Sequence, residues 1–239
     1  MKMDPLLPGV SSDPRLSCSD ILALRRLCWV WPPDLIDEKR LLQMSQTLAR
    51  RPDALAALRG ALRLPPDAPV AHERLGLALQ LAGLLQESVA SYCVSLLYAG
   101  PVARIVIGLA TVLERGGALP EAAHFFEFAT ELEPWCSEHK VALARALISR
   151  GDSGRAIWLL LDIVREQPRD ADCVLLLAGC ALELGELDVA LPAARKSTIL
   201  AGQSPAAWLC VAQVAAAAGF VSESRAADQT ARRLVSNAE

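Results

Sequence analysis

The chain has 239 residues, of which 53% are hydrophobic and only 5% aromatic, and its formal net charge is −3. Because residues of both signs are interspersed, the sequence lacks the clustered basic face that nucleic-acid binding requires. No window offers the roughly 18 to 20 charge-free apolar residues of a membrane-spanning helix. The abundance of Ala and Leu favours helices over sheets, and we expect a soluble, cytoplasmic protein.

The N-terminal segment has two predicted parts. Residues 1–18 are rich in Pro, Ser and Asp and lack the apolar core of a secretory signal, so we predict a disordered tail. Ser19 can cap a short helix that Pro32 stops. Residues 19–34 are therefore predicted to form a helix that covers the open N-terminal end of the fold.

Glycine then recurs at a constant spacing of 34 residues, which predicts an internal repeat. A small residue stands five positions after each glycine, and an aliphatic residue stands eight positions before it. A glycine with positive φ would end a first helix, and the proline or glycine found 17 positions later in most units would end a second one. The repeated glycines are Gly83, Gly117, Gly151, Gly185 and Gly219.

This pattern resembles the tetratricopeptide repeat, a 34-residue unit of two antiparallel helices. The resemblance implies an all-α, right-handed superhelical solenoid of five to six helix-turn-helix repeats. The small positions let the two helices approach closely, and the aliphatic positions fill the seam between them. After a degenerate unit at 35–68, the full units would span 69–102, 103–136, 137–170, 171–204 and 205–238.

No constellation of residues in the sequence supports catalysis or metal binding. His72, His124 and His139 lie in different repeats, and the chain has neither a CxxC pair nor a glycine-rich phosphate loop. Acidic pairs such as Glu186 with Asp188 fall in turns, where carboxylates favour helix N-termini. We therefore predict that the chain is not an enzyme and has no metal and no cofactor.

The seven cysteines are expected to be small core side chains in a reducing compartment. Cys173 and Cys180 share one predicted helix at a spacing of seven residues, and Cys210 lies on the first helix of the next unit. A cluster of these three thiols is the alternative.

In tetratricopeptide solenoids the first helix of each unit lines a concave groove, with positions 2, 5, 9 and 12 of the unit pointing into it. By that resemblance, the groove of this chain is mixed in polarity in the first units and apolar from the third unit onward. Such a groove suits an extended apolar segment or an amphipathic helix of a protein or peptide partner. The predicted groove residues are Leu77, Arg104, Ile107, Thr111, Val141, Arg145, Ile148, Leu175, Leu182, Leu209 and Gln213.

The predicted function is a non-enzymatic protein–protein interaction module, in the role of a secretion chaperone or assembly adaptor. Some family members clamp acidic C-terminal tails with basic residues, but only Lys39 in the degenerate unit matches that pattern. The alternative is a self-associating structural scaffold, which would bury the same apolar face in a homodimer or larger homo-oligomer.

Residues 107–132 are similar to the central repeat of the type III secretion translocator chaperones. The likeness rests on the Gly-Leu-Ala sequence at 108–110 and on Phe125, Phe126 and Phe128. It implies that the chain holds an apolar, aggregation-prone secreted client by its N-terminal segment. These chaperones have fewer repeats than the five or six predicted here.

Pro192 lies about one turn into a predicted second helix. A proline is tolerated near the start of a helix, because the first N–H groups have no partner within the helix. We therefore expect this helix to begin as late as Asp188 or to be slightly kinked.

Overall fold

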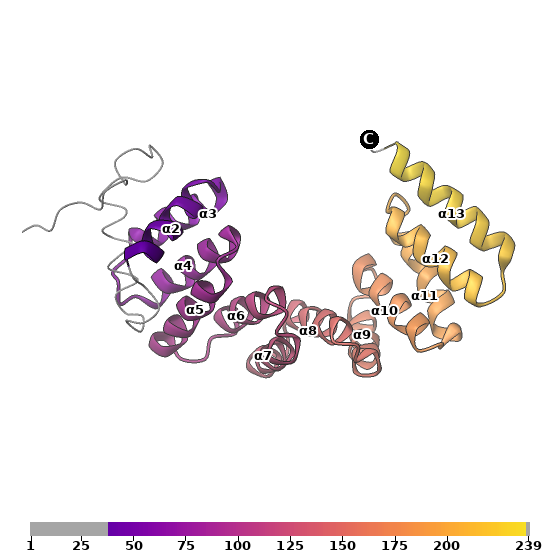
Figure 1. The fold of residues 1–239 in the computed structure, drawn as a ribbon. Coiled ribbons are helices and arrows are strands. Elements are labelled where there is room, and N and C mark those ends of the chain that lie inside the picture. The colour runs from indigo at the N-terminus through magenta and orange to yellow at the C-terminus, as the bar shows by residue number, and fades with distance from the viewer. Residues whose placement is uncertain (1–37, 238–239) are drawn as a thin grey trace, which may run out of the picture. The chain divides into compact units, whose positions relative to one another are not determined.

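The computed structural model describes residues 38–237, in which it has twelve α-helices and no strand (Figure 1). The predicted tail at 1–18 and the predicted capping helix at 19–34 lie outside the described residues. The described chain falls into two compact units, the first ending at Glu133 and the second beginning at Pro134. None of the helices in residues 38–237 is long and apolar enough to cross a membrane.

In the first unit each helix packs against the next, and α4 also contacts α2 and α6. Fully buried side chains such as Met44, Leu58 and Leu75 form one apolar core that extends over α2, α3 and α4. The helices of this unit are α2 (Glu38–Ala49), α3 (Pro52–Leu62), α4 (Pro69–Ala82), α5 (Leu85–Ala99), α6 (Ala103–Arg115) and α7 (Leu119–Leu132).

The second unit has the same serial packing, and here α10 contacts both α8 and α12. Burial is uneven at its C-terminal end: α13 buries only Ala227 and Ala231, whereas α12 buries six residues. The helices of this unit are α8 (Ser137–Ser149), α9 (Ser153–Glu166), α10 (Ala171–Glu183), α11 (Leu187–Leu200), α12 (Pro205–Ala217) and α13 (Val221–Ser236).

The glycines of the 34-residue spacing have the backbone conformation that the sequence predicted. All five have φ between 76° and 83°, which is the left-handed region. At Gly185, the glycine N–H donates to the carbonyl of Leu182 at 3.0 Å, and the next N–H donates to the carbonyl of Ala181 at 2.8 Å. These bonds satisfy carbonyls at the end of α10. Each glycine therefore ends one helix and lets the chain turn back into the next helix.

The small residues five positions after these glycines lie where paired helices meet. Ser88, Ala122, Ala156 and Ala190 are fully buried, and Ser224 in α13 is half-buried. The hydroxyl of Ser88 also donates to the carbonyl of Gly76, 2.7 Å away on α4. A larger side chain at these buried positions would push the two helices apart.

The expected late start of the helix that contains Pro192 is wrong. Helix α11 begins at Leu187, two residues after its glycine, as α9 does after Gly151. Pro192 therefore lies inside the helix, where its missing N–H leaves the carbonyl of Asp188 without its helical donor. Both residues are exposed, so water can hydrogen-bond to this carbonyl.

The prediction of buried cysteines is confirmed for only part of the described chain. Cys173, Cys180 and Cys210 are buried free thiols. Cys93 is exposed, so the prediction is wrong there, and Cys136 is half-buried. Cys93 occupies the solvent side of α5, whereas its neighbour Tyr92 fills the core. Cys18 and Cys28 lie outside the described residues.

Candidate partner-binding site

Four of the predicted groove residues lie in the first unit, on α4 and α6. Arg104, Ile107 and Thr111 are spaced by three and four residues and therefore share one face of α6. Leu77 on α4 is 44% exposed, and Ile107 and Thr111 are half-buried. Arg104 forms an ion pair with Glu73 of α4 at 2.8 Å, which joins the two helices on this side.

The other seven predicted residues lie in the second unit, and none of them is buried. They stand on α8, α10 and α12, which contact one another in sequence as α8 with α10 and α10 with α12. On each helix their spacings of three, four or seven residues place them on one side. We call this set the second-unit face: Val141, Arg145 and Ile148 on α8, Leu175 and Leu182 on α10, and Leu209 and Gln213 on α12.

Gly179 lies between Leu175 and Leu182 on α10 and has no packing reason to be glycine. A Cβ atom built there would have no heavy atom within 4 Å outside its own helix. A glycine in a helix interior costs about 1 kcal/mol relative to alanine. The second-unit face therefore has an open place in the middle of its central helix.

A pocket of about 540 Å³ adjoins the second-unit face, where α8 and the start of α10 come together. Two predicted groove residues, Val141 and Arg145, line it. At its edge, the side-chain amide of Gln167 donates to the hydroxyl of Ser137 at 2.9 Å. The sequence did not indicate the rest of its lining: Cys136, Ser137, Glu138, Gln167, Asp170, Asp172 and Cys173.

The carboxylate of Asp170 holds the start of α10 against this pocket. It accepts hydrogen bonds from the backbone N–H of Cys173 at 3.0 Å and from the thiol of Cys173 at 3.2 Å. The backbone hydrogen bond lowers the pKa of Asp170, and nearby Arg145 acts in the same direction. Burial, with help from Asp170, raises the pKa of Cys173 to about 12. At neutral pH this pocket therefore presents a carboxylate and an un-ionised thiol, which is a weak nucleophile.

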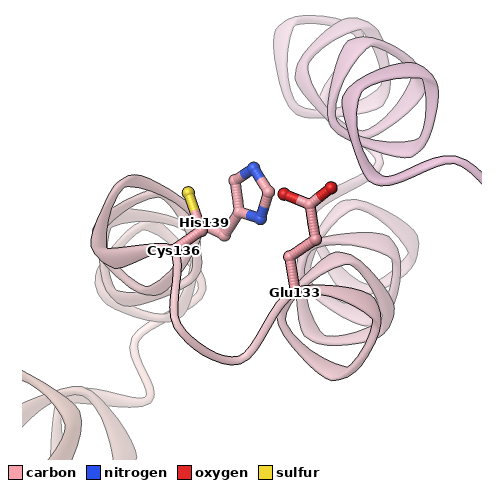
Figure 2. Close-up of side chains that lie close together, drawn as sticks. All are labelled: Glu133, Cys136 and His139. Carbon is pink, nitrogen blue, oxygen red and sulfur yellow. The ribbon is translucent and has the colours of Figure 1, made fainter.

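Three residues of metal-ligand types, Glu133, Cys136 and His139, occur in the sequence around the turn between α7 and α8, and Figure 2 labels them. Glu133 is the last residue of the first unit, and Cys136 and His139 lie at the start of the second unit. They were not predicted from the sequence, because they form neither a CxxC pair nor a pair of histidines. The signal present in the sequence is the spacing of three residues from Glu133 to Cys136 and from Cys136 to His139.

Comparisons with known proteins identify the repeat. A family profile described as Tetratricopeptide repeat matches residues 47–103. A second profile, described as Anaphase-promoting complex, cyclosome, subunit 3, matches residues 116–197. No curated protein matches the chain.

Solved structures with a similar fold include two of MamA and one of YrrB. A MamA RS-1 double mutant is 13% identical, with a TM-score of 0.68 over 72% of this chain and 96% of its own. A MamA MSR-1 structure is 16% identical, with a TM-score of 0.62 over 72% of this chain and 98% of its own. YrrB, described as a TPR protein with an unusual peptide-binding site, is 17% identical. Its TM-score is 0.62, and the match covers 76% of this chain and 93% of YrrB.

At these identities the likeness establishes the fold and nothing finer. The profile matches and the structural neighbours agree with the glycine spacing and with the all-helical structure of residues 38–237. The predicted family and the predicted all-α class are confirmed, while the handedness and the number of repeats stay predictions. The chain belongs to the tetratricopeptide repeat family.

Proposed function

We propose that the chain is a non-enzymatic interaction module whose second-unit face binds an apolar or amphipathic segment of a partner protein. Tetratricopeptide repeats generally serve protein–protein interaction. The observation that carries the proposal is the row of apolar side chains on α8, α10 and α12 that the unit leaves half-buried or exposed. Leu209, for example, is 43% exposed although it lies on a helix with a buried side.

The chemistry of the face favours an amphipathic helix as the bound segment. Its apolar side would cover Leu175, Leu182 and Leu209, at a gain of about 25 cal/mol for each Å² of apolar surface removed from water. The adjoining pocket has Arg145 and Asp172 among its lining residues, and these charges suit the polar side of the same helix. Gly179, with open space above it, would allow the helix to approach closely.

The first unit contributes a smaller face to the proposal. Leu77 and Ile107 offer apolar surface on α4 and α6, with Arg104 and Thr111 beside them. In this proposal the chain acts in the cytoplasm as a holding chaperone or an assembly adaptor. YrrB is described as having a peptide-binding site on the same kind of fold, and that description supports the general mode of binding.

Fluorescence anisotropy with labelled peptides tests the proposal. The probes are a panel of amphipathic helical peptides and scrambled versions of the same composition, which lack an apolar face. The chain should bind at least one amphipathic peptide more tightly than its scrambled version. Leu175→Asp and Arg145→Glu should each abolish that binding while leaving the helical content measured by circular dichroism intact.

Two matched variants on α9 and α11, which are the second helices of their repeats, serve as controls. Ile199→Asp on α11 changes an 82% exposed apolar residue, and Arg165→Glu on α9 reverses an exposed charge. Both should bind the peptide as the unaltered chain does. If Leu175→Asp and Arg145→Glu still bind, the second-unit face is not the binding site.

A sedimentation experiment distinguishes partner binding from self-association. Sedimentation of the purified chain should give the mass of a monomer, with the face open to the peptide. A homodimer that Leu175→Asp converts to a monomer would instead show that the face joins copies of the chain, and the partner-binding proposal would be wrong.

A further inference from the structure

The pocket between α8 and the start of α10 belongs to the second unit alone, because its described lining residues all lie between Cys136 and Cys173. Its volume of about 540 Å³ falls in the range of pockets that hold small ligands, which is about 300 to 1,000 Å³. Val141 and Arg145 belong both to this pocket and to the second-unit face. A segment bound to that face would therefore pass beside the pocket.

The lining of this pocket carries more negative than positive charge. Three acidic side chains line it, and Arg145 is the one cationic side chain in its described lining. The backbone N–H of Cys173 holds the pKa of Asp170 below its ordinary value, so this carboxyl is ionised at neutral pH. Such a lining attracts a cationic group and repels an anionic one. The acidic side chains are those of Glu138, Asp170 and Asp172.

We propose that this pocket receives the guanidinium group of an arginine on the polar side of the bound segment. The inference rests on the proposed function, since the segment that supplies the arginine is the one bound to the second-unit face. A guanidinium has five N–H donors in a planar fork, so it can pair with a carboxylate and reach a second acceptor as well. The ammonium group of a lysine carries the same charge without this fork.

The pocket offers both acceptors and an apolar wall to such a side chain. Glu138 and Asp172 lie in the first turns of α8 and α10, where carboxylates are common, but here they also share one cavity. Gln167 donates from its amide nitrogen to the hydroxyl of Ser137, so its amide oxygen is the end that can accept. The methylene groups of an arginine can lie along Val141 while the charged head stays among the polar groups.

Arg145 indicates a second charge that the same segment should carry. It is exposed on α8 and close enough to Asp170 to help lower the pKa of that carboxyl. An acidic residue of the segment would pair with Arg145, which agrees with the loss of binding expected for Arg145→Glu. Residues three or four positions apart are neighbours on a helix, so an acidic residue and the arginine at this spacing can reach Arg145 and the carboxylates together.

An arginine scan of a bound peptide tests the pocket on the unaltered full chain. The probe is a labelled amphipathic peptide that binds in the anisotropy assay, and each polar-side position is occupied in turn by arginine, lysine, glutamine or glutamate. At one position arginine should bind about fivefold more tightly than glutamine, as expected for a partly exposed ion pair. Lysine should gain less there, and glutamate should bind more weakly than glutamine. The preference for arginine should shrink at high salt.

A double variant locates this preference in the pocket. Glu138→Gln with Asp172→Asn should bind the arginine and glutamine peptides equally, with helical content checked by circular dichroism. The matched control is Glu186→Gln with Asp188→Asn, which removes the same two charges from exposed positions at the start of α11, outside the pocket lining. The control should keep the preference for arginine.

Three outcomes overturn the inference while the peptides still bind and the proposed function stands. They are a scan in which no position prefers arginine to glutamine, a preference that survives Glu138→Gln with Asp172→Asn, and a preference that the control variant loses as well. If no amphipathic peptide binds the chain at all, the proposed function is wrong and the inference about the pocket falls with it.

Discussion

The ring of Tyr92 on α5 fills the space that a side chain at Gly108 on α6 would need. A Cβ atom built at Gly108 would lie 2.5 Å from a ring carbon of Tyr92, and one built at Gly76 on α4 would lie 3.0 Å from the same ring. Tyr92 is only 3% exposed, and its hydroxyl donates a hydrogen bond to the side-chain oxygen of Gln80 at 3.4 Å. One aromatic side chain therefore packs against two neighbouring first helices.

Gly108→Ala should destabilise the first unit. The added methyl group would overlap a rigid, buried ring, and such overpacking typically costs about 1 to 3 kcal/mol. Urea unfolding followed by circular dichroism would measure the loss. In a Tyr92→Leu background the same change should cost less, because the ring is gone. A Gly108→Ala variant as stable as the unaltered chain would contradict this packing.

The buried imidazole of His72 should make the first unit sensitive to mild acid. Its Nε2 lies 2.7 Å from the carbonyl oxygen of Pro66, so this nitrogen carries the hydrogen and donates it. Burial lowers the pKa of His72 below its ordinary value of 6.5, and the bond to Pro66 only partly opposes this shift. The stabilising contribution is therefore complete above pH 6.5 and is lost as the pH falls below that value, where the unfolded chain takes up the proton first.

His72→Gln removes this titration, and His124→Gln, at an exposed position of α7, is the control. The free energy of unfolding should be measured by urea denaturation at a series of pH values from 7.5 down to about 5. The advantage of the unaltered chain over His72→Gln should shrink as the pH falls. An advantage that stays constant, or one that grows, would show that His72 does not titrate in this way.

Gly179→Leu should separate stability from binding. The new side chain enters open space on α10 and improves helix propensity, so the free energy of unfolding should rise or stay unchanged. If a peptide helix lies on the second-unit face, its affinity in the anisotropy assay should fall at least tenfold. Gly154→Leu on α9 also enters open space and should leave the affinity unchanged.

Gly185 should resist replacement by alanine more than by asparagine. Its φ of 76° places it in the left-handed region, where a non-glycine residue pays about 1 to 2 kcal/mol. Asparagine tolerates this conformation better than alanine does. Thermal unfolding should therefore rank the unaltered chain first, Gly185→Asn second and Gly185→Ala last. Equal stability of the two variants would argue against strain at this turn.

The helical hairpins were predictable because their rules are local and repeated. A glycine such as Gly151 ends one helix, and a small residue such as Ala156 marks where the pair crosses, so five copies of each signal reinforce one another. Features that occur once were not predictable in this way. The contact between the Tyr92 ring and Gly108 is one such feature.

In the candidate site too, repeated positions were predictable from the sequence and features that occur once were not. The predicted face residues came from their position on first helices, and the structure leaves all eleven half-buried or exposed, while their binding role stays a prediction. The pocket beside Arg145 was missed because Gln167 and Asp170 belong to the link between α9 and α10, outside the groove positions. Their contribution depends on how a loop folds back on the preceding repeat.

Helix α13 buries only two alanines, and this has a consequence for local opening of the second unit. Ala227 and Ala231 have small side chains, so the fully buried residues of α13 remove less apolar surface from water than those of α12 do. Amide hydrogens of α13 should therefore exchange with solvent at a lower free energy than those of α12. We expect the second unit to open from this helix inward, with α12 transiently exposed before α10.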